Sequence, residues 1–323
     1  MKAIRVHEFG GPEVLTYENV PDPSPKANEA LVKLEAAGVN FIDIYQRTGI
    51  YKLALPLTLG LEGAGTVTAV GADVQSVKVG DRVAWTSVPG AYADYCAVPA
   101  DRLVVLPASV TTRQGAALML QGMTAHYLAC STYPLKPGDV CLIHAGAGGV
   151  GLLLTQVAKM RGARVITTVS NEEKAALSRE AGADLVVMYT QQDFEAEAKA
   201  FTGGKGVAVV YDSVGLTTFE KSINSLVPRG MLVLFGQSSG LVPPVDPQYI
   251  SQKGSLFFTR PTLVHYIASR DELQERARDL IGWTASGALR LRTEFEFPLK
   301  DAADAHKALS GRSTTGKVLL IPG

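Results

Sequence analysis

From residue 121 onward, apolar runs alternate with stretches of helical spacing. The runs are dense in Val, Leu, Ile and Phe, as strands buried on both faces of a sheet are. They cover residues 140–145, 164–169, 185–189, 207–214, 231–236 and 255–260. Helical spacing separates most of them, at residues 151–161, 172–181, 193–201 and 218–226. This alternation predicts right-handed crossovers and a doubly wound parallel sheet of the Rossmann type.

The first part of the chain, up to about residue 120, has shorter apolar runs that Gly and Pro interrupt. The runs cover residues 31–35, 65–70, 81–85 and 92–98. Their spacing predicts short strands in a compact, barrel-like β domain. Pro21, Pro23 and Pro25 predict an extended connector before the first of these strands, because proline disfavours helix at its own position and at the residue before it.

After Pro261 the alternation stops. Helical patterns at residues 270–285 and 301–309 and strand patterns at 293–297 and 316–321 follow. We interpret them as the return of the first domain. Residues 1–121 and 262–323 are then expected to form the catalytic or substrate domain, with residues 122–261 inserted as the Rossmann domain.

The charge balance excludes classes of partner. Lys plus Arg and Asp plus Glu both number 31 among 323 residues, so the chain lacks the basic excess that is usual in proteins that bind nucleic acid or acidic membranes. A small molecule is the expected partner. The three cysteines show no CxxC spacing, which favours a reducing compartment, and residues 1–10 lack the apolar core of a signal peptide. The expected location is cytoplasmic.

Residues 140–158 carry no charge and approach the ~20-residue length of a membrane span. However, four glycines interrupt the segment near its middle, together with polar side chains. This pattern predicts a strand, a tight turn and a buried helix rather than a membrane helix.

The segment HAGAGGVG at residues 144–151 follows an apolar run and opens an apolar helix. Glycine lets the backbone approach a pyrophosphate closely, and a helix N-terminus offers free N–H groups and the positive end of a dipole. A glycine-rich turn can also be purely structural. Because this turn is the first of a series of βα units, it favours a dinucleotide site.

The end of the next strand bears on cofactor choice. Sites that prefer NAD commonly place an acid there to bind the ribose 2′-hydroxyl. Here the residues from Thr167 to Asn171 are all neutral, and Lys174 follows within one helical turn, where its ammonium could meet a 2′-phosphate. The sequence therefore favours NADPH, with Ser170, Asn171 and Lys174 as candidate ligands. Alternatively, Ser170 caps the helix in a capping box with Glu173, and Lys174 is solvated.

With these motifs in view, the chain resembles the zeta-crystallin-like NADPH:quinone oxidoreductase branch of the zinc-free medium-chain dehydrogenases/reductases. The resemblance covers nearly the whole length. It rests on GGPEVL at 10–15, GVNFIDIYQRTG at 38–49, GLEGAG at 60–65, GDRV at 80–83, AGAGGVG at 145–151, YDSVG at 211–215, FGQSSG at 235–240, FFTRP at 257–261 and GKVLLIP at 316–322. It implies an α/β protein whose Rossmann domain is inserted into a GroES-like, β-barrel-type catalytic domain.

The resemblance also shows that zinc ligands are missing. Zinc-dependent relatives carry Gly-His-Glu where this chain has Leu61 between Gly60 and Glu62, and a Cys ligand near the position of Asn40. Three scattered cysteines cannot build a four-cysteine structural lobe. Without a Lewis acid to stabilise an alkoxide, reduction of an electron-poor acceptor such as a quinone becomes the expected reaction.

Such a reduction needs a hydrogen-bond donor, or water, near the acceptor oxygen. Tyr45, Tyr51 and Asn40 are the catalytic candidates. A phenol has an ordinary pKa near ~10, so either tyrosine would donate a hydrogen bond or relay a proton at neutral pH. Alternatively, Tyr45 simply packs beside Phe41 and Ile42.

The resemblance further implies which residues surround NADPH. They are Phe41, Ile42, Asp43, Tyr45, Thr124, Gly148, Gly149, Val150, Gly151, Tyr189, Ser213, Phe235, Gly236, Gln237, Ser238, Phe258, Thr259, Arg260 and Arg312. Arg260 and Arg312 could instead form surface or interdomain ion pairs. Asp212, which we expect to cap or turn the chain, and the histidines His126, His144 and His306 are interpreted as structural.

The main functional hypothesis is therefore NADPH-dependent reduction of quinones. The alternatives are reduction of the double bond of an alkenal or enone, and a non-catalytic NADPH-binding role of the crystallin or RNA-binding kind. The dispersed, balanced charges favour the enzyme. A homodimer is also expected, because the apolar strands at residues 231–235 and 255–259 near one end of the sheet would expose an edge that invites pairing.

Overall fold

The computed structural model describes residues 1–323 and divides into two compact units. Unit 1 comprises Met1–Met123 and Ile267–Gly323, and unit 2 comprises Thr124–Tyr266. The inserted unit thus begins slightly after the expected residue 122 and ends slightly after the expected residue 261. Each unit is described by itself.

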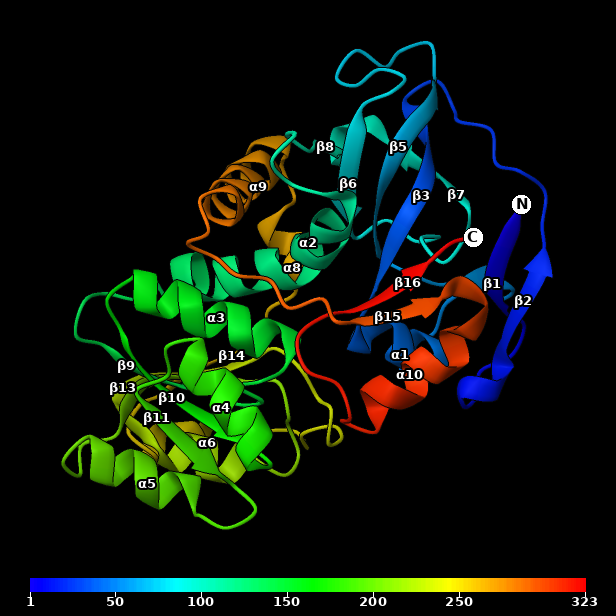
Figure 1. Cartoon of the computed structure of the whole chain (residues 1–323). Coiled ribbons are helices and arrows are strands. Elements are labelled where there is room, and N and C mark those ends of the chain that lie inside the picture. The colour runs from blue at the N-terminus through cyan, green and yellow to red at the C-terminus, as the bar shows by residue number, and fades with distance from the viewer. The chain divides into compact units, whose positions relative to one another are not determined.

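Unit 2 is built on a six-stranded sheet in which every pairing is parallel (Figure 1). The strand order is β11-β10-β9-β12-β13-β14, the doubly wound order in which the chain starts in the middle and turns back to build the second half. Its strands are β9 (Val140–Ile143), β10 (Arg164–Val169), β11 (Leu185–Met188), β12 (Val207–Asp212), β13 (Leu226–Leu234) and β14 (Phe257–Thr259). The predicted Rossmann fold is confirmed.

The helices of unit 2 alternate with these strands. They are α3 (Gly149–Met160), α4 (Glu172–Glu180), α5 (Phe194–Phe201), α6 (Phe219–Asn224), α7 (Pro247–Gln252) and α8 (Leu263–Tyr266). Leu142, Ile166, Val210 and Leu232 come from four neighbouring strands and enter one buried cluster. The apolar runs in the sequence are therefore the strands of a sheet whose centre is buried.

Unit 1 contains two sheets. One has the order β2-β1-β4, and the other runs β15-β16-β3-β5-β6-β8, with β7 also paired to β3. Their strands are β1 (Lys2–Val6), β2 (Leu15–Asn19), β3 (Glu29–Val39), β4 (Leu57–Thr58), β5 (Glu62–Val70), β6 (Arg82–Thr86), β7 (Tyr95–Pro99), β8 (Val104–Val105), β15 (Phe295–Pro298) and β16 (Val318–Ile321). The C-terminal segment does return, because β16 pairs antiparallel with β3.

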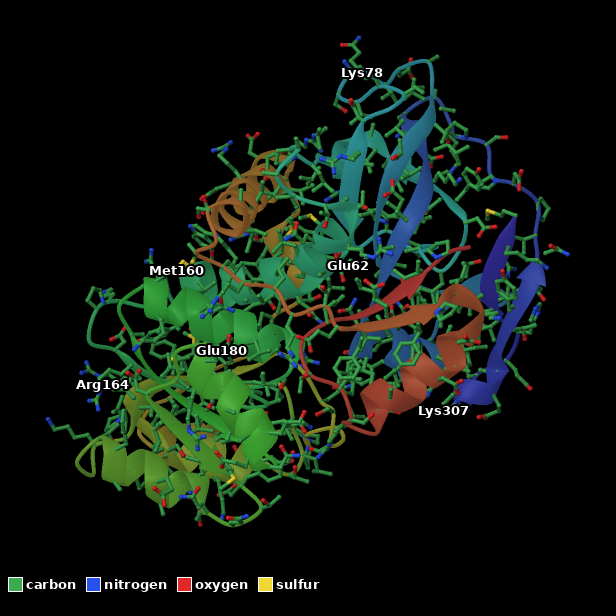
Figure 2. The ribbon with its side chains drawn as sticks, viewed as in Figure 1. Glu62, Lys78, Met160, Arg164, Glu180 and Lys307 are labelled. Carbon is green, nitrogen blue, oxygen red and sulfur yellow. The ribbon has the colours of Figure 1, made fainter.

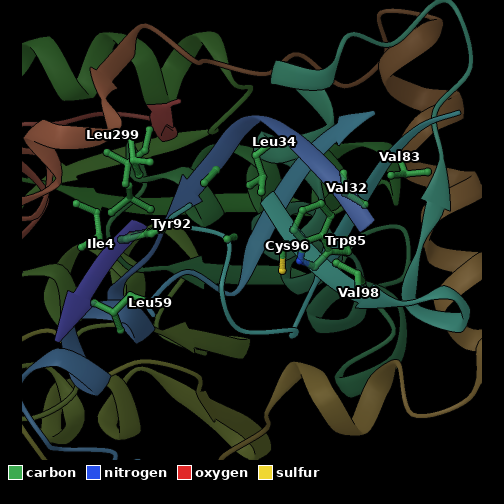
Figure 3. Close-up of a cluster of buried hydrophobic side chains, with 14 of the residues drawn as sticks. Ile4, Val32, Leu34, Leu59, Val83, Trp85, Tyr92, Cys96, Val98 and Leu299 are labelled. Atoms are coloured by element: carbon green, nitrogen blue, oxygen red, sulfur yellow. The ribbon is translucent and has the colours of Figure 1, made fainter. Parts of the chain in front are cut away.

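The helices of unit 1 are α1 (Phe41–Arg47), α9 (Arg270–Ala285) and α10 (Ala302–Ser310), with short 3₁₀ turns at Pro12–Val14, Ala100–Arg102 and Leu299–Asp301. Side chains from both sheets fill one apolar cluster (Figure 3). Ile4 from β1, Val32 and Leu34 from β3 and Trp85 from β6 are all buried in it. This core fixes the positions of the strands and thereby of the polar residues at their ends.

Helix α2 (Thr112–Tyr127) and the π-helical turn that follows it (Leu128–Thr132) are absent from the sequence prediction. From Ala116 onward almost every residue of α2 is buried, so no polar face alternates with an apolar one. A helix that is buried on every side gives no amphipathic signal. No helix of the structure combines the length and the apolar character needed to cross a membrane.

Candidate functional site

In unit 2, the predicted cofactor residues share one edge of the sheet. In a parallel sheet all strands end at the same edge, and a ligand binds where the strand order reverses. That reversal lies between β9 and β12, which are neighbours. The glycine turn follows β9, Ser213 follows β12 and Phe235 follows β13, with Asn171 and Tyr189 beyond the ends of β10 and β11. Thr124 is the exception, because it lies in α2.

The glycine turn presents an uncapped helix N-terminus. Gly148 is the N-cap of α3 and offers no side-chain cap, so the first amides of this 12-residue helix have no partner within the helix. A Cβ on Gly151 would collide with backbone, including the carbonyl carbon of Gly146 at 3.0 Å. At Gly148 a Cβ would find only Ala145, whose oxygen lies 3.2 Å away. Gly151 therefore lets turn and helix pack closely, and Gly148 keeps the space before the amides open.

The end of β10 corrects one sequence interpretation. The N-cap of α4 is Asn171, whose side chain accepts a hydrogen bond from the Lys174 backbone at 3.0 Å. Ser170 is not the cap, so the expected Ser170–Glu173 capping box is wrong. Helix α4 begins one residue later than that box requires. Lys174 is half-buried in its first turn, and Tyr189, just beyond β11, is 43% exposed.

The ends of β12 and β13 approach each other closely. A Cβ on Gly236 would lie 2.5 Å from the Ser213 carbonyl oxygen, so only glycine fits there. The backbone N–H of Ser238 donates to the same oxygen at 3.2 Å. Arg260 reaches back from the end of β14 to the Gln237 side-chain oxygen at 3.5 Å. The structure thus brings together five of the residues that the resemblance named.

Asp212 and His144 form a buried network beside this edge. The Asp212 carboxylate accepts hydrogen bonds from the backbone of Val214 and Gly215 at 2.8 and 3.0 Å, and from Ser222 at 2.9 Å. The two ring nitrogens of His144 contact Ser222 and Thr168, each at 2.9 Å. Burial lowers the pKa of His144 and holds the ring neutral. Asp212 shapes the turn after β12, as expected.

These observations fit a dinucleotide. A ligand binds where the strand order reverses, and at Gly148 the missing side chain leaves the helix amides open to a pyrophosphate. The end of β10 has no acid, which suits a phosphorylated ribose. The amides at Gly149–Gly151 and the residues Asn171 and Lys174 are therefore the candidates in unit 2 for holding the pyrophosphate and the phosphorylated ribose.

The catalytic candidates belong to unit 1. Tyr45 lies on α1 and is 8% exposed, whereas Tyr51 lies just after the helix and is 39% exposed. Their rings meet edge to face with centroids 5.6 Å apart, and the Tyr51 backbone donates to the Tyr45 carbonyl at 3.1 Å. Phe41 packs 6.3 Å from Tyr45. The structure thus joins the two tyrosines in one aromatic group and gives Tyr51 the greater exposure.

Asn40 is buried, and its side-chain amide is fully engaged. Its nitrogen donates to Glu62 at 3.0 Å and to the Gly38 carbonyl at 3.3 Å. Its oxygen accepts from Lys317 at 2.9 Å and from Gln121 at 3.3 Å. These bonds use the capacity of the amide, so Asn40 cannot also donate to a substrate without breaking one of them. The sequence prediction did not include Glu62, Gln121 or Lys317, although Glu62 and Lys317 lie within two of the motifs quoted above.

Asp43 is also buried, one turn along α1. Its carboxylate accepts from the Asn40 backbone at 2.8 Å and from the Tyr92 hydroxyl at 3.0 Å. The Tyr92 hydroxyl lies 3.1 Å from His306, whose other ring nitrogen is 3.2 Å from Arg47. Burial raises the pKa of Asp43 to about 7 and lowers the pKa of His306 to about 3. Asp43 as a whole is 0% exposed, so its cofactor contact stays a prediction of the resemblance.

Two other site questions concern Arg312 and metal ions. Arg312 is exposed after α10 and has a left-handed backbone, with φ of 58°. No three His, Cys, Asp or Glu side chains are grouped so that they could hold a metal ion.

Comparison with known proteins decides the family. A protein of Escherichia coli (strain K12) named quinone oxidoreductase 1 is 45% identical to this chain, and the match covers 99% of each. The chain belongs to the quinone oxidoreductase family. Its expected place among the medium-chain dehydrogenases/reductases is thereby confirmed. Two family models match as well: the GroES-like domain of alcohol dehydrogenases over residues 26–108 and the zinc-binding dehydrogenase over residues 149–285.

Two further similarities concern cofactor and substrate. The crystal structure of Escherichia coli quinone oxidoreductase complexed with NADPH matches with a TM-score of 0.98 and 44% identity over 100% of both chains. A 2-haloacrylate reductase of a Burkholderia species is 41% identical, with 98% of each chain covered. Both are similar to this quinone oxidoreductase over its full length.

Proposed function

We propose that this quinone oxidoreductase uses NADPH to reduce quinones. The proposal rests mainly on the similarity to the protein named quinone oxidoreductase 1. That similarity covers 99% of this chain and therefore includes both units. Similarity to an NADPH complex supports the choice of cofactor. The sheet edge of unit 2 supports the choice of NADPH independently. Its glycine turn suits a pyrophosphate, and the neutral residues and Lys174 that follow β10 suit a 2′-phosphate.

On the cofactor side, the amides at the start of α3 bind the pyrophosphate, and the positive end of the helix dipole adds to their attraction. Lys174, half-buried beside the Asn171 cap, binds the 2′-phosphate. Tyr189, Ser213, Phe235, Gly236, Gln237, Ser238, Phe258, Thr259 and Arg260 surround the rest of the molecule. NADPH supplies the hydride.

On the substrate side, a hydrogen-bond donor of the chain, or water, supplies the proton that the reduced quinone takes up. A quinone that has accepted a hydride is a hydroquinone anion, which takes up one proton. Tyr51 is the better placed donor, because its phenol is partly exposed, and Tyr45 supports its ring. Asn40 holds the start of α1 rather than the substrate, as its four internal hydrogen bonds indicate.

We also propose that the reaction needs no zinc. The residue set supports this: Leu61 offers no ligand, Asn40 is bonded internally, and no group of metal-binding side chains is formed. Zinc analysis before and after dialysis against a chelator tests it. We expect unchanged quinone reduction by protein without zinc, whereas stoichiometric zinc whose removal abolishes activity would contradict the proposal.

A second acceptor class is favoured by one observation. The similar Burkholderia enzyme is named a 2-haloacrylate reductase, so its acceptor is an activated alkene. Hydride delivery to a conjugated alkene also moves charge onto a carbonyl oxygen, where the same tyrosine can donate. An alkene acceptor is therefore the alternative substrate class.

Steady-state oxidation of NADPH at micromolar protein separates these functions. The acceptors are a para-quinone, an ortho-quinone, an alkenal and 2-chloroacrylate, tested in parallel. We expect kcat/KM to be highest for a quinone. Faster reduction of the alkenes would move the assignment to a double-bond reductase, and NADPH binding without any turnover would favour a non-catalytic role.

We further propose a homodimer that pairs along β14, the terminal strand of the sheet in unit 2. Its Phe257 is 59% exposed, and Leu241 and Val264 nearby in sequence are exposed as well. An exposed apolar edge strand invites pairing with a second copy. Light scattering should give twice the 34.3 kDa of one chain, and Phe257→Lys should shift the mass toward one chain. A single-chain mass for the unmodified protein at all concentrations would refute the dimer.

No nucleic-acid or membrane partner is proposed, since the charges are balanced. The three cysteines show no CxxC spacing, and Cys96 and Cys141 are buried thiols. This favours the reducing environment of the cytoplasm, which fractionation of cells that express the chain would check.

A further inference from the structure

A buried ion pair lies in unit 1 beside the start of α1. Glu62, the first residue of β5, and Lys317, just before β16, form a salt bridge between side chains that are almost completely shielded from solvent. Figure 2 labels Glu62 within unit 1. The pair meets Asn40 from the β3–α1 junction and Gln121 from α2, both buried. Four segments that are distant in sequence therefore converge on a few polar atoms.

The polar atoms of this cluster are closely matched. One oxygen of Glu62 accepts from the Leu120 backbone at 2.6 Å, and the other accepts from Asn40 at 3.0 Å and from Lys317. The Lys317 ammonium also donates to the Asn40 oxygen at 2.9 Å. Asn40 is thus held from both sides, as a donor to the anion and as an acceptor from the cation.

Stability alone does not account for such a pair. Removing two charges from water costs about as much as their attraction returns, and apolar residues of similar size often stabilise a fold at least as well. The fold also leaves room for the pair, because a Cβ on Gly38 would lie 2.6 Å from the Lys317 ammonium. The pair instead restricts the orientation of Asn40, since its hydrogen bonds are satisfied in one placement of that side chain.

The position of Asn40 in turn determines the position of the start of α1. It is the N-cap residue of the helix, and its backbone N–H is tied to Asp43 at 2.8 Å. The first turn of α1 carries Phe41 and Ile42, and Tyr45 follows. The resemblance names all three as cofactor contacts, and Tyr45 also packs against the proposed proton donor Tyr51. A shift of Asn40 would therefore move the segment that carries these proposed contacts.

We propose that Lys317, through its ion pair with Glu62, is a positioning residue for quinone reduction: it fixes Asn40 and thereby the first turn of α1. This inference rests on the proposed function. Lys317 touches neither substrate nor cofactor, and it acts on the alignment of groups that do. Alignment errors of about 1 Å can lower the rate of a reaction by roughly 100-fold.

Three variants test the role. Glu62→Gln/Lys317→Met removes both charges, so neither is left buried alone. Gln121→Met removes only the 3.3 Å bond to Asn40 and leaves the ion pair in place. Val98→Ala, in the apolar core of the same unit (Figure 3), serves as the control, because it loosens the fold without touching the cluster. For each variant, kcat and KM for benzoquinone, the Kd for NADPH and the melting temperature are measured.

We expect kcat to fall at least about 10-fold in the double variant and less in Gln121→Met, with the NADPH Kd within about threefold of its original value. Val98→Ala should lower the melting temperature and leave kcat unchanged. A folded double variant with the original kcat would overturn the inference, and so would a loss of kcat that Val98→Ala reproduces at equal loss of stability. If the double variant does not fold, the single variant Glu62→Gln decides, because it removes the anion of the pair and keeps the shape of the side chain; an unchanged kcat there would contradict the role. Failure of the unmodified chain to reduce any quinone would overturn the proposed function instead, and this inference with it.

Discussion

The sheet edge of unit 2 and the polar cluster of unit 1 use polar groups in opposite ways. At the edge, the backbone amides that begin α3 have no side-chain cap, Lys174 is half-buried and Tyr189 is exposed. In the cluster, the side chains of Asn40 and Glu62 are buried and bonded to one another. The edge presents the first amides of α3 and solvent-accessible side chains, whereas the polar atoms of the cluster are hydrogen-bonded to one another and shielded from solvent.

This difference assigns different consequences to substitutions in the two regions. Groups at the accessible sheet edge are the proposed ligands of the cofactor, so their loss should appear in a dissociation constant. Groups that are bonded internally hold geometry, so their loss should appear in a rate, and the raised pKa of the neighbouring Asp43 should appear in the pH dependence of stability. The following experiments sharpen or break this division.

The largest effect is expected at Asp43, in the buried region. Its pKa is raised from 3.8 to about 7, mainly by burial. Because the pKa of Asp43 is higher in the folded state than in the unfolded state, protonation of this carboxyl stabilises the fold. The contribution is complete below pH 3.8 and is lost as the pH rises to 7. A pKa difference of about three units corresponds to about 4 kcal/mol of unfolding free energy. From pH 4 to pH 8, the unfolding free energy of the unmodified protein should therefore fall by about that amount relative to Asp43→Asn.

His306 makes that comparison necessary, because it works in the opposite direction. Its pKa is lowered from 6.5 to about 3, so its contribution is present above pH 6.5 and is lost as the pH falls toward 3. The unmodified protein should therefore show a nearly flat stability profile in this range, and Asp43→Asn should reveal a slope that rises with pH. Urea unfolding across the range measures both. Parallel profiles for the two proteins would show that Asp43 ionises as an ordinary carboxyl.

At the sheet edge of unit 2, Gly148→Val should weaken the binding of both NADPH and NADH by at least about 100-fold, because it removes access to more than one amide, each worth about 1.5 to 3 kcal/mol toward a charged group. A Cβ on Gly148 would lie 3.2 Å from the Ala145 backbone oxygen, which is a tight contact, so the variant must first be shown to fold. Fluorescence titration with both cofactors, beside a melting curve, is the measurement. Unchanged affinity in a folded variant would remove the pyrophosphate from this turn.

Lys174→Ala should weaken NADPH alone. One charge-assisted bond to the 2′-phosphate is worth about 1.5 to 3 kcal/mol, which predicts a loss of roughly 10- to 150-fold. NADH lacks that phosphate and should hardly respond. Lys174→Glu should move the preference further toward NADH. An equal loss for both cofactors would remove the phosphate assignment.

The smallest effect is expected for Asn171→Ala, the matched control for Lys174. Loss of its 3.0 Å bond to the Lys174 backbone should cost about 1 kcal/mol of stability. Both cofactors should then weaken slightly and together. Ser170→Ala should leave the melting temperature unchanged, because Ser170 caps nothing; a larger loss at Ser170 than at Asn171 would restore the original capping interpretation.

The parts of the site that depend on local sequence could be predicted. A glycine turn between an apolar strand and an apolar helix is visible within eight residues, and the alternation of strands and helices places it at the middle of the sheet. The cap of α4 was missed by one residue, because Ser170 and Asn171 are both good caps and only the backbone decides between them.

The cluster of unit 1 could not be predicted in this way. Asn40, Glu62, Gln121 and Lys317 come from four segments that only the tertiary fold brings together, and one of those segments, α2, has no amphipathic pattern to announce it. The family motifs pointed to Glu62 and Lys317 separately. Their pairing, and the role of Asn40 between them, required the structure.

The division between the two regions is tested most directly by measuring the NADPH Kd and the kcat for benzoquinone in Lys174→Ala and in Glu62→Gln/Lys317→Met side by side. Lys174→Ala should raise the Kd and, at saturating NADPH, keep the original kcat. The double variant should keep the Kd and lose kcat. If both variants change the same constant, binding and positioning are not separated in this molecule, and the account is wrong.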